Sequence, residues 1–349
     1  MKRCPLALSF VALLALPVGA RAAEAPAFSL PASYGGMQMP VPADNPMTAG
    51  KIKLGEQLFF DKRLSKSKTK SCESCHVPEK GWTDGLKLSP KDDGTVNVRH
   101  SPTLYEVGFL EQLYWDGRAK GLEAQILAAW KGQMSGDPDA VAKELEAIPA
   151  YKSAFEAELG GPPTGDRIVK ALATFVRTIH AGDTAYDKLA RDKKALDKSD
   201  AGKGFLVFSG EVARCTNCHL PPVFTDTLFH NVGIGFDTEK PDLGRGKFLA
   251  DAAEKEKKPA PPEAESLKGA FKTPSLRGIG NSGPYFHDGR AATLEEAVDL
   301  MLAGGIANPS LDKEKLQPAK VTPEQRKQLL AFLKALTPEV KEYPRPKLP

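Results

Sequence analysis

Apolar residues return at helical spacing in several segments of the chain. In RIVKALATFVRTI (167–179) they recur every three or four positions, which predicts a helix with one buried face. Other helix starts are marked by N-cap residues: Asp137 and Pro138 precede AVAKELEAI, and capping boxes precede AVDLML and RKQLLAFLKAL. The capping boxes pair Thr293 with Glu296 and Thr322 with Gln325. These signals predict an all-α protein.

Between these segments the chain is rich in Pro and Gly, with 29 and 31 residues respectively. This composition favours a loop-rich helical fold with little strand over a large sheet. Residues 23–45 are Pro-rich and are expected to wrap the surface. The charged, Pro-rich segment ADAAEKEKKPAPPEAES (250–266) is expected to be a mobile surface loop.

The N-terminus has the pattern of a secretory signal peptide. Lys2 and Arg3 form a positive n-region, residues 6–18 form an apolar core too short to span a bilayer, and residues 20–22 (Ala-Arg-Ala) form a cleavage site. We therefore expect residues 1–22 to be removed on export; a buried N-terminal helix is the alternative. The rest of the chain offers no apolar stretch suited to a membrane anchor, so an exported, soluble protein is expected.

Composition narrows the class of protein. The 349 residues are 41% hydrophobic and 26% charged, which is typical of a soluble globular chain with about two domains. Removing residues 1–22 takes away three of the 48 basic residues and none of the 44 acidic ones, which leaves a net charge of +1. This balance gives no reason to expect nucleic-acid binding.

Four of the five cysteines lie in two copies of one motif, CESCH (72–76) and CTNCH (215–219). Cys-x-x-Cys-His is the signature of c-type haem attachment, in which two thioethers hold the haem and the His binds its iron. The predicted attachment residues are Cys72, Cys75, Cys215 and Cys218, and the predicted iron ligands are His76 and His219. A redox dithiol, a disulfide or a zinc site is the alternative use of these cysteines. Two covalently bound haem c groups would indicate a bacterial periplasm.

The chain repeats itself beyond these motifs. SPTLYEVGFLEQLYWDGRAKGLEAQ (101–125) aligns without a gap to TPSLRGIGNSGPYFHDGRAATLEEA (273–297). We interpret this as internal duplication of a cytochrome c-like haem domain. The predicted boundaries are 46–190 for the N-terminal domain, 191–340 for the C-terminal domain and 341–349 for a tail.

The two copies differ at the position that would close the second face of the haem. Met301 lies 14 residues after His287, and its counterpart in the first copy is Ala129. A Met thioether is a common sixth ligand of haem c, whereas Ala cannot bind iron. Filling the core is the alternative role for Met301, and His100 in the first copy is either a ligand or a hydrogen-bonded structural residue. The pattern predicts a closed C-terminal haem for electron transfer and an open N-terminal haem for a small molecule.

Trp115 and two arginines complete the candidates. Trp115 takes the place of His287 in the repeat, where it could conduct electrons between the haems or serve as a core aromatic residue. Arg118 and Arg290, in the two Asp-Gly-Arg motifs, could pair with haem propionates or with nearby carboxylates.

Together these residues resemble the dihaem bacterial cytochrome c peroxidases, a family that includes the MauG-type enzymes. The resemblance covers nearly the whole mature chain. Its motifs are DNP near 44–46, LGEQLFFDKRLS, the two CxxCH motifs, YWDGR with LEAQ, YKSAF, FVRT, FTDTLFHNVG, PYFHDGR, and Met301 followed by LLAFLKALT.

The resemblance implies a role for each half. Hydrogen peroxide would be reduced to water at the open N-terminal haem, and a small periplasmic donor, a cytochrome c or a cupredoxin, would deliver electrons to the C-terminal haem. Met301 matches the sixth ligand of that second haem, where MauG-type enzymes have a Tyr, and so favours the peroxidase branch. Trp115 matches the Trp between the haems, and Gln125 matches a distal-pocket Gln.

The chain departs from the family pattern in the distal pocket. The family has Glu-Met-Gly there, and its Glu moves protons, but GQMSG (132–136) puts Gln133 at that position. Gln can hydrogen-bond peroxide but cannot shuttle a proton. Turnover is therefore slow, or water or an acid such as Glu123 substitutes, or the protein has another role. The family's removable distal His is also missing, since residues 77–99 contain no His, so the N-terminal haem is expected to be open without reductive activation.

Calcium binding is the second point of departure. The family holds a calcium ion between its domains through an Asn side chain and backbone carbonyls. Ser282 and Pro284 could supply carbonyls, but His100 stands at the Asn position and is a poor partner for a hard cation. The sequence therefore allows calcium without requiring it.

The predicted function is that of a periplasmic dihaem c-type peroxidase, with Gln133, Gln125 and Trp115 as its catalytic residues. One alternative is a MauG-like enzyme that oxidises a residue of a partner protein. Another is a dihaem electron-transfer protein without turnover. Homodimers are common in the family, and a homodimer is a further expectation.

Overall fold

The computed structural model describes residues 28–349. The predicted signal peptide (1–22) and the first part of the Pro-rich segment lie outside these residues. Within residues 28–349, none of the helices combines the length and apolar character that a bilayer crossing needs.

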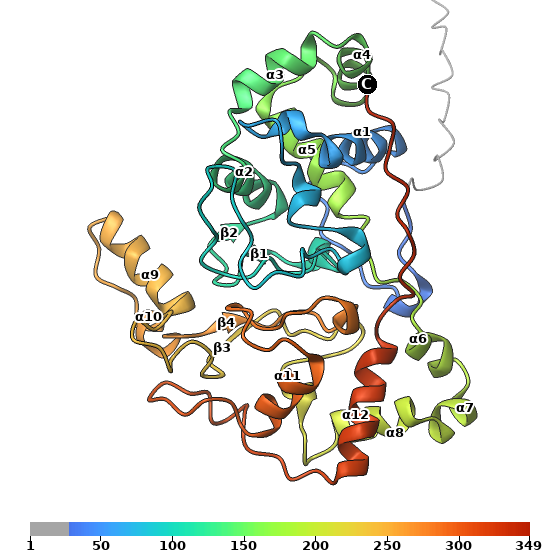
Figure 1. Cartoon of the computed structure of the whole chain (residues 1–349), viewed down its shortest axis with the longest axis vertical. Coiled ribbons are helices and arrows are strands. Elements are labelled where there is room, and N and C mark those ends of the chain that lie inside the picture. Colours follow the sequence, from blue (N-terminus) through green and yellow to red (C-terminus); the bar gives the residue numbers. More distant parts are fainter. Residues whose placement is uncertain (1–27) are drawn as a thin grey trace, which may run out of the picture.

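The described chain consists of helices joined by long loops, with two short pairs of strands (Figure 1). The helices are α1 (Ala49–Phe60), α2 (Leu122–Gln133), α3 (Pro138–Glu146), α4 (Pro149–Leu159), α5 (Gly165–Val176), α6 (Ala185–Ala190), α7 (Lys193–Lys198), α8 (Asp200–Ser209), α9 (Gly244–Lys255), α10 (Glu263–Ser266), α11 (Leu294–Leu302) and α12 (Pro323–Ala335). Strands β1 (Gln112–Leu113) and β2 (Ala119–Lys120) pair antiparallel, as do β3 (Phe229–His230) and β4 (Phe271–Lys272). The prediction of a helical, loop-rich fold with little strand is confirmed.

The helix starts follow the capping signals. Thr293 accepts a hydrogen bond from the Glu296 backbone N–H, and the Glu296 carboxylate accepts one from the Thr293 N–H. The same reciprocal pair forms at the start of α12. At α3, the Asp137 carboxylate accepts from two backbone N–H groups, and the run 167–179 forms most of α5. The capping predictions are confirmed because each cap joins residues less than one helical turn apart. The predicted helix 167–179 is confirmed as far as Val176, where α5 ends.

Helices α1 and α5 pack together in a first hydrophobic cluster, which spans residues 54–181. A glycine permits their close approach, since a Cβ on Gly55 would lie 2.0 Å from the Ala171 carbonyl oxygen. Phe59 of α1 then meets Phe175 of α5 edge to face, with ring centroids 5.3 Å apart.

Helices α8 and α12 form a second cluster, which spans residues 208–336, in the same way. A Cβ on Gly204 would lie 1.9 Å from the Gln328 carbonyl oxygen. Phe208 and Phe332 have ring centroids 4.9 Å apart, and Phe224 packs against both. Each half of the described chain therefore has a core built around one close helix pair.

The two halves lie one above the other in Figure 1, with the blue and green helices over the yellow and red ones. Backbone hydrogen bonds join them: the His100 N–H donates to the His287 carbonyl at 2.7 Å, and the Lys272 N–H donates to the Trp115 carbonyl at 2.8 Å. An ion pair between Arg99 and Asp242 adds a further connection, with N and O atoms 2.7 Å apart.

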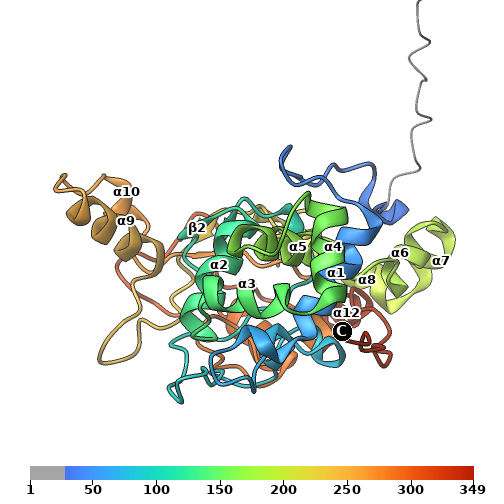
Figure 2. The same cartoon turned by 90° about the horizontal axis from the view of Figure 1, so that it is seen from above.

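Residues 250–266 were expected to form a mobile loop, and this expectation is wrong for most of the segment. It contains the second half of α9 and all of α10, which project from the lower half in Figures 1 and 2. Ala, Glu and Lys are strong helix formers, and Lys247 pairs with Asp251 one turn along α9 at 2.8 Å. Only the Pro-rich residues 256–262 between the two helices remain irregular.

The chain beyond α12 returns to the upper half as an extended strap (Figure 1). We call residues 341–349 the tail. The Tyr343 hydroxyl donates to Glu56 of α1 at 2.6 Å, and Arg345 pairs with Glu73 and Glu79. The C-terminal tail thus lies against the segment that carries the first Cys-x-x-Cys-His motif.

Candidate active site

The first motif lines a cavity of about 320 Å³ in the upper half. Cys72, Cys75 and His76 contribute to its wall, together with many apolar side chains. The His76 Nδ1 lies 2.9 Å from the Trp82 carbonyl oxygen. Because a carbonyl can only accept, Nδ1 carries the proton and Nε2 keeps its lone pair. Burial also lowers the pKa of His76, which keeps the imidazole neutral and able to bind a metal.

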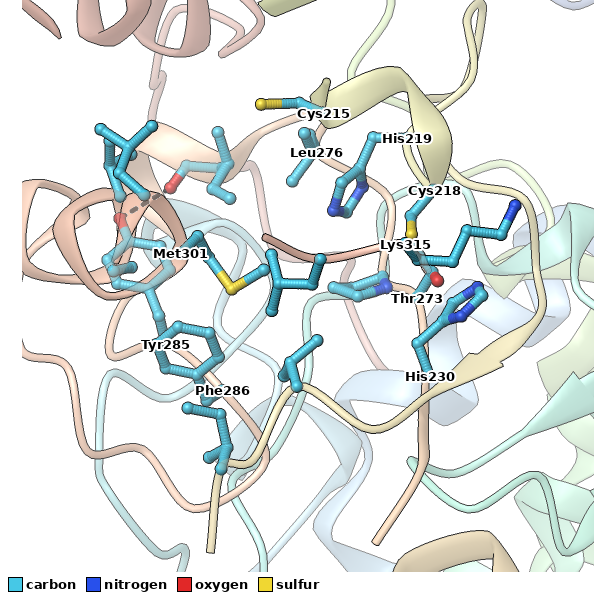
Figure 3. Close-up of a pocket in the computed structure, with 18 of the residues that line it drawn as sticks. Cys215, Cys218, His219, His230, Thr273, Leu276, Tyr285, Phe286, Met301 and Lys315 are labelled. Carbon is cyan, nitrogen blue, oxygen red and sulfur yellow. Dashed lines mark hydrogen bonds between the residues drawn. The ribbon is translucent and has the colours of Figure 1, made fainter. Parts of the chain in front are cut away.

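The second motif repeats this arrangement in the lower half. Cys215, Cys218 and His219 line a cavity of about 230 Å³ (Figure 3). The His219 Nδ1 lies 2.9 Å from the Phe224 carbonyl oxygen, and burial lowers the pKa of His219 as well. Both cavities therefore present one neutral imidazole with a free Nε2 beside two thiols.

The state of the thiols distinguishes between the uses of the cysteines. In the described part of the chain all four are free rather than paired. Burial raises the pKa of Cys72 and of Cys215 to about 12, so neither thiol is activated as a redox nucleophile. Apolar walls, a ligating imidazole and two thiols for thioether bonds fit a covalently held haem better than a reactive dithiol.

One group of three potential metal ligands occurs within residues 28–349, namely Cys218, Asp226 and His230. The His230 Nδ1 lies 2.6 Å from Asp312, and its Nε2 lies 2.9 Å from Asp226. Both ring nitrogens are thus occupied by carboxylates, and Asp226, together with Cys218 and Asp312, raises the pKa of His230 to about 10. A protonated imidazole offers no lone pair, so the geometry does not favour zinc here.

Met301 lies on α11 and lines the cavity of the second motif. Figure 3 shows its sulfur pointing into the same space as the His219 imidazole, from a different wall. A group held by His219 could therefore meet the Met301 thioether on its other face.

The corresponding wall of the first cavity is formed by α2. Gln125, Ala129 and Gln133 are spaced four residues apart on this helix, so they share one face, and all three line the cavity. The Gln133 Oε1 atom is buried and has no hydrogen-bond partner among the described residues. Ala129, at the place that matches Met301, has no side chain that could bind iron, and Gln133 adds an amide to this wall. Met134, the C-cap residue of α2, also lines the cavity.

Glu123 cannot replace the missing carboxylic acid from its present position. It lies outside the residues that line the first cavity, and both its oxygens accept hydrogen bonds from Arg177, at 2.7 and 2.8 Å. Burial alone would raise its pKa, but hydrogen bonds from Arg177 and Asn45 lower the pKa overall. The suggestion that Glu123 supplies protons to the site is therefore not supported by the geometry.

His100 has the hydrogen bonds of a structural residue. Its Nδ1 lies 2.8 Å from the Leu86 carbonyl, and its Nε2 lies 3.5 Å from the Thr83 hydroxyl. Its own carbonyl accepts from the Trp115 indole N–H at 2.8 Å. Both ring nitrogens face protein atoms, so the alternative of His100 as an iron ligand has no support from the geometry.

Trp115 lies between the two candidate sites, since its side chain lines both cavities. Its ring meets the His287 ring at a centroid distance of 6.4 Å. The arginines of the two Asp-Gly-Arg motifs are already paired: Arg118 with Asp116 at 3.0 Å, and Arg290 with Asp237 and Asp288 at 2.8 and 2.7 Å. Both arginines therefore already form ion pairs with local carboxylates.

The surroundings of the calcium candidates are not acidic. Pro284 lines a surface hollow together with Lys87 and Lys334, and the one carboxylate lining it, that of Glu295, already pairs with Lys334 at 2.7 Å. Two ammonium groups near this hollow disfavour a divalent cation.

Tyr114 was absent from the candidates, although it lines the first cavity. The available signal was its place directly before Trp115 in YWDGR, where the second copy has Phe286. The alignment gives only the place of Tyr114 in the repeat, because the sequence does not show which wall of the cavity its side chain lines.

Comparison with known proteins bears directly on these sites. Residues 49–195 match the family model described as di-haem cytochrome c peroxidase. The chain is 38% identical over 315 residues to methylamine utilization protein MauG of Methylorubrum extorquens, covering 89% of this chain and 85% of that protein. It is 36% identical over 335 residues to cytochrome-c peroxidase IdrP1 of Denitromonas iodatirespirans, covering 89% and 88%. The crystal structure of a MauG-like protein associated with microbial copper homeostasis matches with a TM-score of 0.73 and 29% identity, over 87% of this chain and 93% of that one.

The fold and these relatives define a haem-dependent oxidoreductase. The chain belongs to the dihaem cytochrome c peroxidase and MauG family. It is therefore a dihaem oxidoreductase that acts on peroxide.

Proposed function

We propose that the protein is a periplasmic dihaem c-type peroxidase that reduces hydrogen peroxide to water at its N-terminal site. Electrons from a small redox protein, a cytochrome c or a cupredoxin, enter through the C-terminal site. The observation that carries this proposal is the asymmetry of the cavities, with Met301 on the wall of one and Ala129 at the matching place in the other. A closed site suits electron transfer, and an open one suits a small substrate.

The proposal includes an internal duplication with domains at 46–190 and 191–340. Matching backbone features support it: Trp82 and Phe224 both have positive φ, at 60° and 55°, and both accept the hydrogen bond of the neighbouring motif histidine. Tyr114 and Phe286 also share positive φ, at 63° and 69°. Positive φ is uncommon for bulky residues, so its recurrence at aligned positions favours a common origin.

Each residue has a part in this scheme. Haem, when bound, would supply the redox chemistry, and Cys72, Cys75, Cys215 and Cys218 would attach the two groups through thioethers. His76 and His219 would each hold one iron, and Met301 would be a second protein ligand in the C-terminal site. In the N-terminal site the amides of Gln125 and Gln133 hydrogen-bond and orient peroxide, while Trp115 connects the two sites.

A MauG-like activity, in which a residue of a partner protein is oxidised, is the second candidate. It is favoured by the 38% identity to MauG and by the amide of Gln133, which is a poor proton source for rapid peroxide turnover. Met301 argues for the peroxidase.

Calcium at the Ser282 and Pro284 carbonyls and a homodimer remain predictions. Metal analysis of the purified holoprotein would test the first, and light scattering would test the second.

Stopped-flow mixing of the two-haem protein with peroxide and a reduced small cytochrome separates the candidates. Oxidation of two donor molecules per peroxide is expected for the peroxidase. A spectral response to peroxide without donor oxidation would favour the partner-protein enzyme, and no response would contradict both.

EPR of the fully oxidised protein tests whether the N-terminal site is open. It should show a high-spin ferric signal from that site, and low-spin signals alone would refute the openness.

A further inference from the structure

The first cavity contains a phenol in the position where the second has a plain aromatic ring. Tyr114 follows β1 and has φ of 63°, and Phe286 at the aligned position has φ of 69°. The shared left-handed backbone conformation places both side chains in the walls of their cavities. The hydroxyl group is therefore the difference between the two sites at this position.

The side of the cavity on which Tyr114 lies follows from its neighbours. Figure 3 shows Phe286 below Tyr285, on the same side of the cavity as Met301 and away from His219. In the first cavity Tyr114 shares the lining with Gln125, which belongs to the α2 wall that carries Ala129 and Gln133. Tyr114 thus lies on the wall that matches Met301, where peroxide would bind.

The other polar groups that line this cavity are mostly occupied. Arg99 pairs with Asp116 and Asp242, and the indole N–H of Trp115 is bonded to the His100 carbonyl. The hydroxyls of Ser101 and Thr103 are bonded to Ser89 and to the Gly81 carbonyl, at 2.6 Å in both cases. The amides of Gln125 and Gln133 carry no acidic proton. Among the described residues, the cavity-lining hydroxyl and ammonium groups without a hydrogen-bond acceptor are those of Tyr114, Ser71 and, on the 85–99 loop, Lys91. Of the two hydroxyls, the phenol of Tyr114 is the more acidic.

Arg118 prepares Tyr114 for this role. The guanidinium carbon of Arg118 lies 3.5 Å from the centre of the Tyr114 ring, and the Arg118 side chain is 39% exposed. Burial raises the pKa of Tyr114, which Arg118 and Gln125 partly offset, so the phenol keeps its proton at neutral pH. A cation beside the ring stabilises the phenolate that forms on proton transfer, and it connects the site to solvent.

We propose that Tyr114 is a catalytic residue that donates a proton to peroxide in the N-terminal site, in place of a distal carboxylic acid. The proposal rests on the proposed peroxide reduction. As the O–O bond breaks, the departing oxygen keeps the bonding electron pair and its own hydrogen, and the Tyr114 proton completes the first water. Solvent reprotonates the phenolate past Arg118 and Asp116. Over the full reaction one peroxide, two donor electrons and two protons yield two waters.

The test compares Tyr114→Phe with the wild-type two-haem protein. The second-order rate of the spectral change on mixing with hydrogen peroxide should fall by about 100-fold, the lower range for general acid catalysis. Fluoride binding to the open ferric site, followed by absorbance, should weaken by about fivefold to tenfold, because one hydrogen-bond donor is lost. Gln133→Glu, placed in the Tyr114→Phe background, should restore most of the peroxide rate by returning a carboxylic acid.

Two controls keep the result specific. Tyr105→Phe removes a buried phenol outside the cavity and should leave both measurements unchanged, and Lys91→Met tests the other proton source. A wild-type protein that does not respond to peroxide would overturn the proposed function itself. If the wild type responds and Tyr114→Phe reacts equally fast, or if Lys91→Met is the slow variant, the role of Tyr114 is overturned while peroxide reduction stands.

Discussion

The ring of Tyr343 in the tail lies 5.3 Å from the ring of Trp82, edge to face at 76°. Trp82 is the residue whose carbonyl accepts the hydrogen bond of His76. A residue near the C-terminus therefore packs against the one that orients the first candidate iron ligand. The tail links the end of the chain to the geometry of the N-terminal site.

We expect Tyr343→Ala to lower the free energy of unfolding by about 1–2 kcal/mol, less than for a fully buried aromatic ring because Tyr343 is half-buried. Tyr343→Phe keeps the ring contact and loses only the bond to Glu56, so it should cost about 1 kcal/mol or less. Urea unfolding followed by tryptophan fluorescence measures both. Equal stability of all three proteins would show that the tail is only loosely held.

The ion pair between Glu123 and Arg177 predicts a pH-dependent contribution to stability. The pKa of Glu123 is lowered from its ordinary 4.5, so its contribution is complete above pH 4.5 and is lost as pH falls through the lower folded value. Glu123→Gln should cost about 1–3 kcal/mol at pH 7, and this difference should shrink at low pH. Chemical unfolding at several pH values measures it.

The same variant distinguishes structure from catalysis. Glu123 lies outside the cavity, so Glu123→Gln should leave the peroxide reaction rate of the folded holoprotein unchanged. A large decrease in that rate, at full haem occupancy, would instead indicate that Glu123 supplies a proton in the reaction.

Met301 and Ala129 allow a reciprocal experiment on the proposed asymmetry. Met301→Ala should lower the reduction potential of the C-terminal haem, because the Met ligand favours ferrous iron. Ala129→Met should add a thioether to the open site and slow both azide binding and the peroxide reaction. Redox titration and ligand-binding spectra measure these effects. An unchanged C-terminal potential in Met301→Ala would assign Met301 to the core instead.

The accuracy of the sequence predictions depended on how far apart the interacting residues lie. The helix caps could be predicted because each joins residues three positions apart, as Thr293 and Glu296 do. The contact of Tyr343 with Trp82 joins residues 261 positions apart, and nothing in either segment indicates it. The sequence alone leaves Glu123 available as an acid, because its partner Arg177, 54 positions away, cannot be assigned from local patterns. Partners of charged groups depend on tertiary packing, which local patterns do not encode.

Two glycines provide a last test, which concerns the packing of the first core. Gly55→Ala would bring a Cβ within 2.0 Å of the Ala171 carbonyl, so α1 and α5 must separate, at a cost of about 3 kcal/mol. Gly132 in α2 is the matched control, because a Cβ there meets nothing within 4 Å. Gly132→Ala should therefore stabilise the protein by up to about 1 kcal/mol through helix propensity alone. Urea unfolding followed by circular dichroism compares the two, and a Gly55→Ala protein as stable as the control would mean that α1 and α5 do not touch through this glycine.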